Sequence, residues 1–415
     1  MSCASGSVTD LRRRLPLVVA LLLAACAGPP SRTPRGPVAE PAAPVHEGPA
    51  ATVPAGIRIA AVGDMMLGTD YPKDILPDDD GASFLAAVTP TLSAADLAFG
   101  NLEGVLADDS EPAKECSNAS ACFLFRSPTR YARLFRDAGF DVLSLANNHA
   151  RDFGEEGRTE TMRALDALGI LHSGRVGDFA SLTVRGTRIA VLAYSVTQQS
   201  NLLLDYDLAA DTVAAFAATH DIVVVSFHGG AEGWDVTRLP FGEETYYGEP
   251  RGDVVRFARL MVDAGADLVI GHGPHVVRAV ERYRGRLIAY SLGNFATYYG
   301  ISVNGIYGFA PILIVTLDDK GRFLQGEIVS TRQIRPAGPS IDPDRVAQKV
   351  MRGLSIADFG NSGLTFMPDG RLLPTDRTTR AGEDGRPPPA RVTRRLRRAS
   401  LRPAPIEFGG TDHRT

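Results

Sequence analysis

Side chains that can bind a divalent metal recur where apolar stretches of this 415-residue chain end. Five such places carry candidate ligands: Asp64, Asn101 with Glu103, Asn148 with His149, His228 with Glu232, and His272 with His275. One histidine after a strand is usually structural, but oxygen and imidazole donors at successive strand ends suit a metal site built from loops. Mn²⁺, Fe²⁺ and Zn²⁺ all accept this mixed donor set, so the residue types do not choose among them.

The densest group of polar residues is the stretch from Ser144 to Asp152, which contains Asn147 beside Asn148 and His149. The run 141–146 predicts a short buried strand, and apolar residues at helical spacing follow Gly157. The polar group is therefore expected in a loop between a strand and a helix, where open α/β sheets bind ligands. Asn147 and Asp152 are secondary candidates. The alternative is an asparagine-rich turn with one surface histidine.

The elements that must position these residues alternate along the chain. Strands are predicted at 57–62, 96–100, 141–146, 171–174, 188–194, 221–227, 267–270 and 287–291, with a closing hairpin at 311–317 and 323–329. Helices are predicted at 84–92, 128–138, 158–168 and 251–264. The pattern predicts one α/β domain over 56–360, and Asn294, which follows the strand at 287–291, is a further secondary candidate.

The N-terminus has the order of a bacterial export signal. Three arginines precede an apolar run at 15–25, which is shorter than the roughly 20 residues of a membrane-spanning helix. Leu23-Ala-Ala-Cys26 resembles a lipobox, so residues 1–25 are predicted to be a lipoprotein signal peptide and Cys26 a lipidation site. An ordinary signal peptide is the alternative. The Pro/Ala-rich segment 26–55 is predicted to tether the domain to a membrane of the bacterial cell envelope.

Export also affects the oxidation state of the two cysteines that lie beyond the signal segment and the predicted lipidation site. Cys116 and Cys122 enclose five small or polar residues and are predicted to pair in an oxidising compartment, with two free thiols as the alternative. Residues 361–415 are predicted to be a disordered Arg/Pro-rich tail, either solvated or bound to an anionic polymer, lipid headgroup or phosphate. The net charge of −4 gives no overall attraction to nucleic acid, and none is expected as a partner.

Several of these motifs together resemble the capsule-synthesis protein CapA family. They are Gly63-Asp-Met-Met-Leu-Gly, Asn101-Leu-Glu, Ser144-Leu-Ala-Asn-Asn-His, His228-Gly, Gly271-His-Gly-Pro-His-Val and Ser291-Leu-Gly-Asn-Phe. The resemblance covers about 57–330. It implies a role in poly-γ-glutamate capsule or related exopolymer synthesis. It also implies a four-layer α/β/β/α sandwich with mixed sheets, similar to calcineurin-like metallophosphoesterases.

The same resemblance suggests roles for the candidate residues. The metal ligands would be Asp64, Glu103, Asn148, His228, His272 and His275, with His149 contacting substrate or protonating a leaving group. Three positions depart from the phosphoesterase pattern. Met66 replaces a histidine, Asn101 replaces a metal-bridging aspartate, and Gly273 replaces a further histidine, so a complete two-metal centre is in question.

Two classes of function follow. In the first, one or two divalent ions serve a hydrolase or transferase that acts on a phosphoester or γ-glutamyl amide. In the second, a non-catalytic export component keeps a degraded metallophosphatase fold and binds the polymer. The retained histidines slightly favour the enzyme. Either class would have an anionic capsule polymer or its synthase complex as partner.

Overall fold

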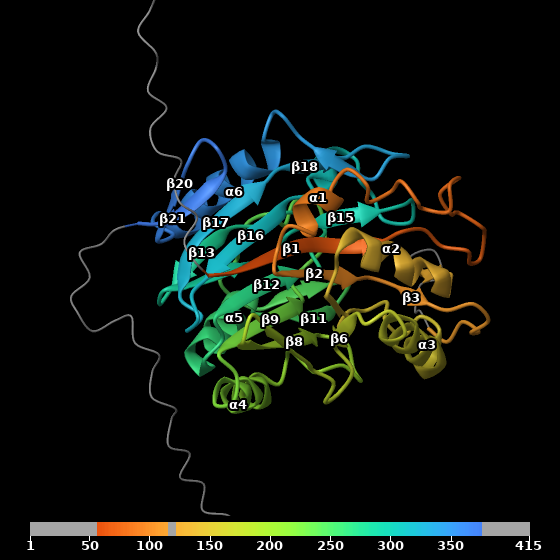
Figure 1. The fold of residues 1–415 in the computed structure, drawn as a ribbon, viewed down its shortest axis with the longest axis horizontal. Coiled ribbons are helices and arrows are strands. Elements are labelled where there is room, and N and C mark those ends of the chain that lie inside the picture. The colour runs from red at the N-terminus through yellow and green to blue at the C-terminus, as the bar shows by residue number, and fades with distance from the viewer. Residues whose placement is uncertain (1–55, 115–121, 376–415) are drawn as a thin grey trace, which may run out of the picture. The chain divides into compact units, whose positions relative to one another are not determined.

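Two mixed β-sheets form the centre of the part of the chain that the structure describes, residues 56–114 and 122–375 (Figure 1). The structure is a computed structural model. The signal segment, the tether, Cys26 and Cys116 lie outside the described residues. Cys122 is described and is disulfide-bonded, while its pairing with Cys116 stays a prediction. None of the helices within the described ranges is both long and apolar enough to cross a membrane.

The larger sheet has nine strands and contains the N-terminal strand β1 (Ile57–Met66) near its middle. Its order is β20 (Leu364–Phe366), β21 (Arg371–Pro374), β17 (Phe323–Val329), β16 (Ile312–Leu317), β1, β2 (Leu97–Leu102), β5 (Val142–Ser144) and β6 (Leu171–Ser173). A ninth strand, β15 (Asn294–Thr297), pairs in parallel with the end of β1. The predicted hairpin is confirmed as β16 and β17.

The smaller sheet has six strands. Its order is β13 (Val280–Tyr283), β14 (Arg286–Ala289), β12 (Leu268–His272), β9 (Ile222–His228), β8 (Thr187–Ser195) and β7 (Ala180–Val184). The four inner strands are parallel, so β9 and β12 end at the same edge and place His228 opposite His272.

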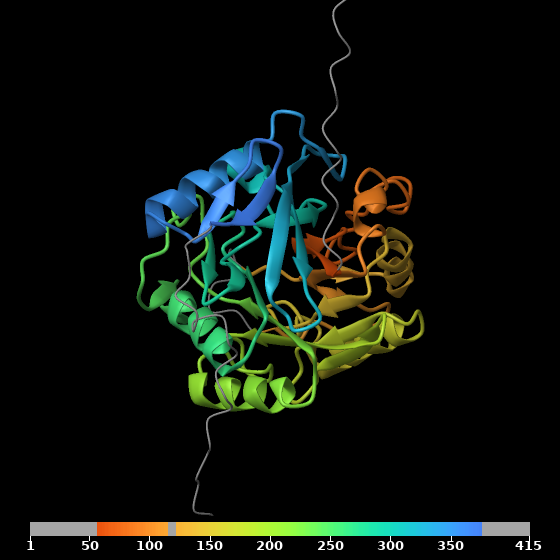
Figure 2. The same ribbon diagram turned by 60° about the vertical axis from the view of Figure 1, so that its left-hand side comes forward.

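The sheets pack face to face, and helices cover their outer faces (Figure 2). The core between the sheets takes alternate residues of each strand, such as Ile57 and Ile59 of β1 and Ile222 and Val224 of β9. The nine-stranded sheet is covered by α1 (Thr89–Leu92), α2 (Ala132–Ala138) and α3 (Gly154–Asp166), and the six-stranded sheet by α4 (Tyr206–Ala217) and α5 (Val254–Ala264). The predicted α/β/β/α sandwich is thereby confirmed.

The helix α6 (Val346–Phe359) and several short elements complete the domain. The short elements are β3 (Val105–Leu106), β4 (Arg126–Ser127), η2 (Thr129–Tyr131), β10 (Glu244–Tyr246), β11 (Glu249–Gly252), η3 (Gly305–Gly308), β18 (Thr331–Gln333) and β19 (Pro339–Ile341). The predicted helix at 84–92 is wrong in its first part, where successive turns replace it. α1 begins only at Thr89, because Pro90 in its first turn has no N–H to donate to a preceding helical turn.

The predicted tail begins too early. Residues 361–375 are part of the fold, because β20 and β21 extend the nine-stranded sheet beyond β17. Leu364 and Leu372 are buried in the core between the sheets. Two strands this short, set among Gly, Asp and Arg, carry too few apolar residues to show a period, so the sequence pattern did not reveal them.

Candidate metal centre

Strand register brings the first candidate ligands together at one edge of the larger sheet. Asp64 pairs with Asn101 of β2 on one side and with Asn294 of β15 on the other. Asp64 and Asn101 thus lie inside their strands rather than beyond them. The pairing of β1 is irregular at Asp64, and Glu103 follows β2 with its N–H bonded to the Met65 carbonyl at 2.9 Å.

Ligand atoms of Asp64, Glu103 and His228 lie within 4.8 Å of one another, and all three residues are buried. The Oε1 of Glu103 is 3.3 Å from the Nε2 of His228, so the two sheets meet here. The Oε2 of Glu103 is buried without a hydrogen-bond partner. An unsatisfied buried carboxylate oxygen is costly, and a bound cation would satisfy it.

His272 and His275 surround the Asp64 carboxylate. The Nδ1 of His275 lies 3.1 Å from Asp64 Oδ2 and 3.0 Å from Asn294 Oδ1, and His272 Nδ1 lies 3.4 Å from Asp64 Oδ1. The Nε2 of His275 is 3.7 Å from both Glu103 Oε1 and Glu232 Oε2. His275 therefore touches carboxylates contributed by three separate segments.

Burial and charge set the ionisation of this cluster. Burial raises the pKa of Glu103 to about 7 and lowers the pKa of His228 to about 3, so His228 is neutral, as a metal ligand must be. Burial would also raise the pKa of Asp64, but hydrogen bonds and charges from His272 and His275 hold it well below its usual value. Burial opposes the charge on His275, yet Glu103, Asp64 and Glu232 raise its pKa to about 10.

The asparagines form a row of hydrogen bonds beside the acidic cluster. Asn101 donates from Nδ2 to Asp64 Oδ1 at 2.9 Å, and Asn147 donates from Nδ2 to Asn101 Oδ1 at 3.0 Å. Asn147 Oδ1 accepts the His149 N–H at 3.0 Å. Asn101 and Asn147 thus orient their neighbours. The Oδ1 of Asn148 is buried without a hydrogen-bond partner, which leaves it available to a cation.

His149 is held by the buried carboxylate of Asp152. Its Nδ1 lies 2.7 Å from Asp152 Oδ2, which also accepts the Phe125 N–H at 2.8 Å. Lys114 pairs with Asp152 Oδ1 at 3.0 Å. With Nδ1 bound to the carboxylate, Nε2 is the nitrogen left for a substrate. Sequence reasoning missed Lys114 and Phe125, because neither belongs to a strand end.

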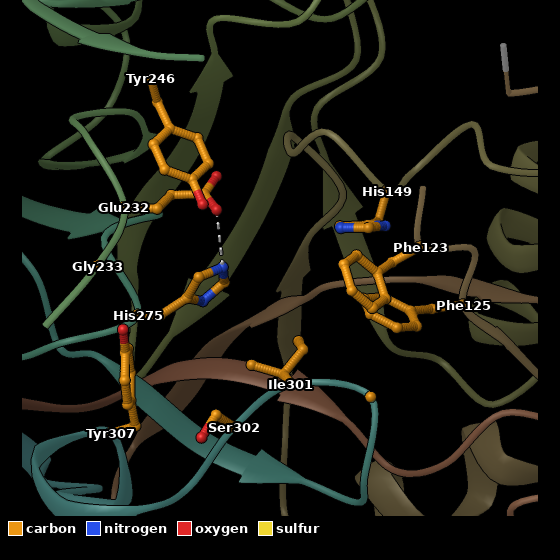
Figure 3. A pocket seen from close by; sticks show the side chains of 11 residues that line it. Phe123, Phe125, His149, Glu232, Gly233, Tyr246, His275, Ile301, Ser302 and Tyr307 are labelled. Atoms are coloured by element: carbon orange, nitrogen blue, oxygen red, sulfur yellow. Dashed lines mark ion pairs between the residues drawn. The ribbon is translucent and has the colours of Figure 1, made fainter. Parts of the chain in front are cut away.

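A cavity of about 200 Å³ opens beside this cluster (Figure 3). His149, Phe123 and Phe125 lie on one side of it, across from Glu232, Tyr246 and His275. Its lining also includes Gly233, Gly300, Ile301, Ser302 and Tyr307. Most of these residues come from loops, while Tyr246 ends the short strand β10 and Tyr307 lies in η3. No periodic or motif signal marks any of them in the sequence except His149, His275 and Glu232.

Glu232 faces His275 and is fixed from behind by Arg251. The Arg251 guanidinium lies 2.9 Å from Glu232 Oε1 and donates from Nε to the Gly230 carbonyl at 2.9 Å. Burial opposes the charge on Glu232, but His275 and Arg251 lower its pKa, so the carboxylate is ionised at neutral pH.

Two departures from the phosphoesterase pattern have structural reasons. Met66 packs in an apolar cluster with the cavity-lining residues Phe125 and Ile301, so the position supports the cavity wall from behind instead of donating a ligand. Gly273 has φ +112°, and a Cβ there would lie 2.9 Å from the Gly229 carbonyl oxygen and 3.3 Å from His228 Nδ1. A histidine at 273 would crowd the loop that follows β9.

The structure therefore defines an α/β/β/α protein with carboxylate, amide and imidazole groups gathered at the strand ends of both sheets. The chain belongs to the family described as bacterial capsule synthesis protein PGA_cap, whose model matches residues 58–299. It is similar to the capsule biosynthesis protein CapA of Bacillus anthracis, with 28% identity over 260 residues, 58% of this chain and 59% of that protein.

Other relatives have related names. The PGA biosynthesis protein CapA of Bacillus subtilis is 29% identical over 251 residues, covering 56% of this chain and 61% of that protein. A Mycobacterium tuberculosis protein named "probable polyglutamine synthesis accessory protein" is 33% identical over 185 residues, covering 38% and 45%. The chain thus spans less than two thirds of the length of these relatives.

Two of the solved structures that resemble this fold distantly have named activities. One is a 5'-nucleotidase precursor from Thermus thermophilus, with a TM-score of 0.40, 13% identity, and coverage of 72% of this chain and 58% of that one. The other is the purple acid phosphatase PPD1 of yellow lupin, with a TM-score of 0.36, 11% identity, and coverage of 70% and 54%. These scores are too low to transfer an activity.

Proposed function

We propose that this capsule-synthesis protein carries a divalent-metal site that hydrolyses or transfers a phosphoester or γ-glutamyl amide group of a cell-envelope polymer. The observation that carries the proposal is the buried group of Asp64, Glu103 and His228, with ligand atoms within 4.8 Å, next to a cavity lined by His149. Two carboxylates and a neutral imidazole suit Mn²⁺, Fe²⁺ or Zn²⁺.

The donor set fits one cation well. Asp64, Glu103 and His228 would hold it. His272 and His275, which lie beside Asp64, and the unpartnered Oδ1 of Asn148 are the further candidate donors. A cation there would polarise a phosphoryl or carbonyl oxygen of the substrate. The positive charge that His275 now carries between Asp64, Glu103 and Glu232 would no longer be needed to balance those carboxylates.

His149 would act as the general acid. Its Nδ1–H donates to Asp152, which orients the ring, while Nε2 would deliver a proton to the leaving group. Lys114 forms an ion pair with Asp152 and so stabilises the buried carboxylate. The aromatic wall of Phe123 and Phe125 would limit the access of water from that side of the cavity.

A second candidate function is polymer binding without catalysis. It is favoured by Met66, which packs into the cavity wall, and by Asn101, whose amide binds Asp64 in place of a bridging carboxylate. In that case the relatives' names would reflect an accessory role beside a synthase, and the cluster would be a remnant of a phosphoesterase.

The test is a metal-loading and turnover experiment on the purified chain. Loading with Mn²⁺, Fe²⁺ or Zn²⁺ should give stable occupancy, followed by turnover of a phosphoester or γ-glutamyl peptide panel. His149→Ala should keep the metal and lower turnover by about 10² to 10⁴-fold. Absence of uptake, or capsule production unaffected by His149→Ala, would favour the binding function.

We also propose that the protein is exported and anchored through a lipid on Cys26, with the synthase complex or its anionic polymer as partner. Cys26→Ala should release the protein from the membrane fraction and abolish acyl labelling. The Cys116 and Cys122 disulfide should appear in non-reducing mass spectra, and two alkylatable thiols in exported protein would contradict it.

A further inference from the structure

Glu232 places a negative charge on the wall of the cavity, across from His149 (Figure 3). Its Oε1 lies 2.9 Å from the Arg251 guanidinium, whereas its Oε2 lies 3.7 Å from the Nε2 of His275. The Arg251 side chain is only 3% exposed, so a molecule in the cavity meets the carboxylate before the guanidinium. Among the described residues that line the cavity, Glu232 is the only carboxylate, and none is a lysine or an arginine.

The proposed function assigns no role to Glu232. Its side chain is outside the group of three described residues whose ligand atoms lie within 4.8 Å of one another. With Arg251 at 2.9 Å, the carboxylate stays ionised at neutral pH and is a poor proton acceptor. Glu232 is therefore a fixed charge in this cavity, and its effect depends on the charge of the molecule that enters.

The other charges around the metal centre balance one another. The two carboxylates that would hold a divalent cation also balance its charge, and that cation would replace the positive charge of His275 in the metal-free chain. Lys114 balances Asp152 at 3.0 Å, and Arg251 balances Glu232. The described residues of the cavity wall thus supply no further lysine or arginine to balance a substrate with two negative charges.

The possible reacting groups differ in their charge. A phosphomonoester carries close to two negative charges at neutral pH, whereas a phosphodiester carries one and an amide carries none. Glu232 is close enough to repel such charges, because the His275 ring lies 3.7 Å from both Glu232 and the candidate ligand Glu103. Like charges at this separation in a partly dehydrated site disfavour binding. Glu232 therefore penalises a phosphomonoester about twice as strongly as a phosphodiester.

We propose that Glu232 is a specificity-determining residue that discriminates against phosphomonoesters, so that the reacting group carries at most one negative charge. An internal phosphodiester or amide linkage of a polymer meets this condition, and a terminal phosphate does not. The inference rests on the proposed function, because the charge of a reacting group matters only if the centre is catalytic. It narrows the substrate class from any phosphoester to an internal linkage.

Two substrates that differ by one methyl group and one charge test the inference. p-Nitrophenyl phosphate is a dianion at about pH 8, and methyl p-nitrophenyl phosphate is a monoanion. The purified chain, loaded with Mn²⁺, should have the larger kcat/KM for the methyl diester. Turnover of γ-glutamyl p-nitroanilide in place of the diester would also support the inference and would identify the linkage as an amide.

Glu232→Gln keeps the size of the side chain and an oxygen for Arg251 but removes the charge. It should shift the ratio of the two kcat/KM values by about tenfold towards the monoester, the effect of one unit charge a few ångströms away. Calorimetry gives a readout that does not depend on turnover. Binding of inorganic phosphate should strengthen relative to dimethyl phosphate by a similar factor. Glu232→Asp, which keeps the charge, should retain the wild-type preference.

Glu243→Gln is the matched control, because Glu243 is an exposed carboxylate whose partner is the Tyr206 hydroxyl. It should leave both ratios unchanged. A wild-type preference for the monoester, or an unchanged ratio in Glu232→Gln, would overturn this inference alone. Loss of Mn²⁺ from Glu232→Gln would also overturn it, because Glu232 would then be a ligand. A wild-type chain that takes up no metal would overturn the proposed function, and this inference with it.

Discussion

Glu103 and His228 meet at 3.3 Å although 125 residues separate them in the chain. Glu103 follows β2 of the nine-stranded sheet, and His228 ends β9 of the six-stranded sheet. The contact therefore joins the two sheets at the edge where the candidate ligands gather, and each residue offers a buried donor atom to the proposed cation.

His228→Ala should lower metal content to a small fraction of the wild-type value. It removes a neutral imidazole donor from a buried site, which leaves too few ligands for tight binding. Elemental analysis after loading and dialysis measures the loss. His172→Ala is the control, since His172 pairs with Asp166 and Asp178 outside the cluster. Equal metal loss in both variants would contradict a specific site.

Asp152→Asn should keep the metal but lower turnover by roughly 10- to 100-fold, less than the loss of His149 itself. The amide oxygen can still accept the Phe125 N–H, but a neutral acceptor replaces the charged one for the His149 Nδ1–H and orients the ring less firmly. The loss should fall on kcat with KM nearly unchanged, and steady-state kinetics measure both. A fall in metal content or folded fraction that accounts for the whole loss of turnover would show that Asp152 is only structural.

Metal affinity should rise with pH. Glu103, with a pKa of about 7, and His275, with a pKa of about 10, must each lose a proton to become ligands, whereas His228, with a pKa of about 3, is already neutral. Association of Mn²⁺ should therefore strengthen about 100-fold per pH unit below 7 and about tenfold per unit above it. His275→Ala removes one of the two protons that binding displaces, so the slope below pH 7 should fall to about tenfold per unit. Because the charge of His275 lowers the pKa of Glu103, its loss should also move the end of the rise above pH 7. Calorimetry at several pH values measures both effects, and a wild-type plateau above pH 7 would show that His275 is no ligand.

Arg278→Ala should destabilise the fold by about 3 to 5 kcal/mol, since it leaves Glu244 as an unpaired buried charge. The two side chains are almost fully buried and make two hydrogen bonds, at 2.9 and 2.7 Å. Urea unfolding measures the change. Arg284→Ala removes an exposed partner of Asp263 and should leave the midpoint nearly unchanged. The double variant with Glu244→Gln should recover part of the loss.

The sequence predicted the ligand-bearing strand ends because each places polar residues after an apolar run that a sheet must bury. His228 and His272 are the clearest cases, as parallel strands with equal ends put both side chains at one edge. The sequence also predicted Glu232 as a candidate, since it follows the same strand as His228. The layered fold came from the family resemblance, and the packing of alternate strand residues agrees with it.

The cavity walls could not be predicted in the same way. Phe123 lies in a loop, Tyr246 in a short hairpin and Tyr307 in the short helix η3. The positions of such segments depend on tertiary contacts that leave no period in the sequence. The orienting role of Asn101 could not be predicted either. An asparagine side chain can bind a metal, but the amide of Asn101 is hydrogen-bonded to Asp64 and Asn147 instead. Met66 shows the reverse case, in which a missing ligand turned out to be part of an apolar wall.

The separation of the ligands along the chain has a consequence for folding. His275 contacts Asp64 across 211 residues, so no short segment contains the cluster, and it exists only after both sheets have formed and docked. Contacts of such long range form late, because the chain must first lose the entropy of closing large loops. A cation therefore cannot nucleate this domain in the manner of a zinc finger. A cation bound at this site would act afterwards, by slowing the separation of the two sheets, so we expect metal to lengthen the unfolding half-life while leaving the refolding rate unchanged.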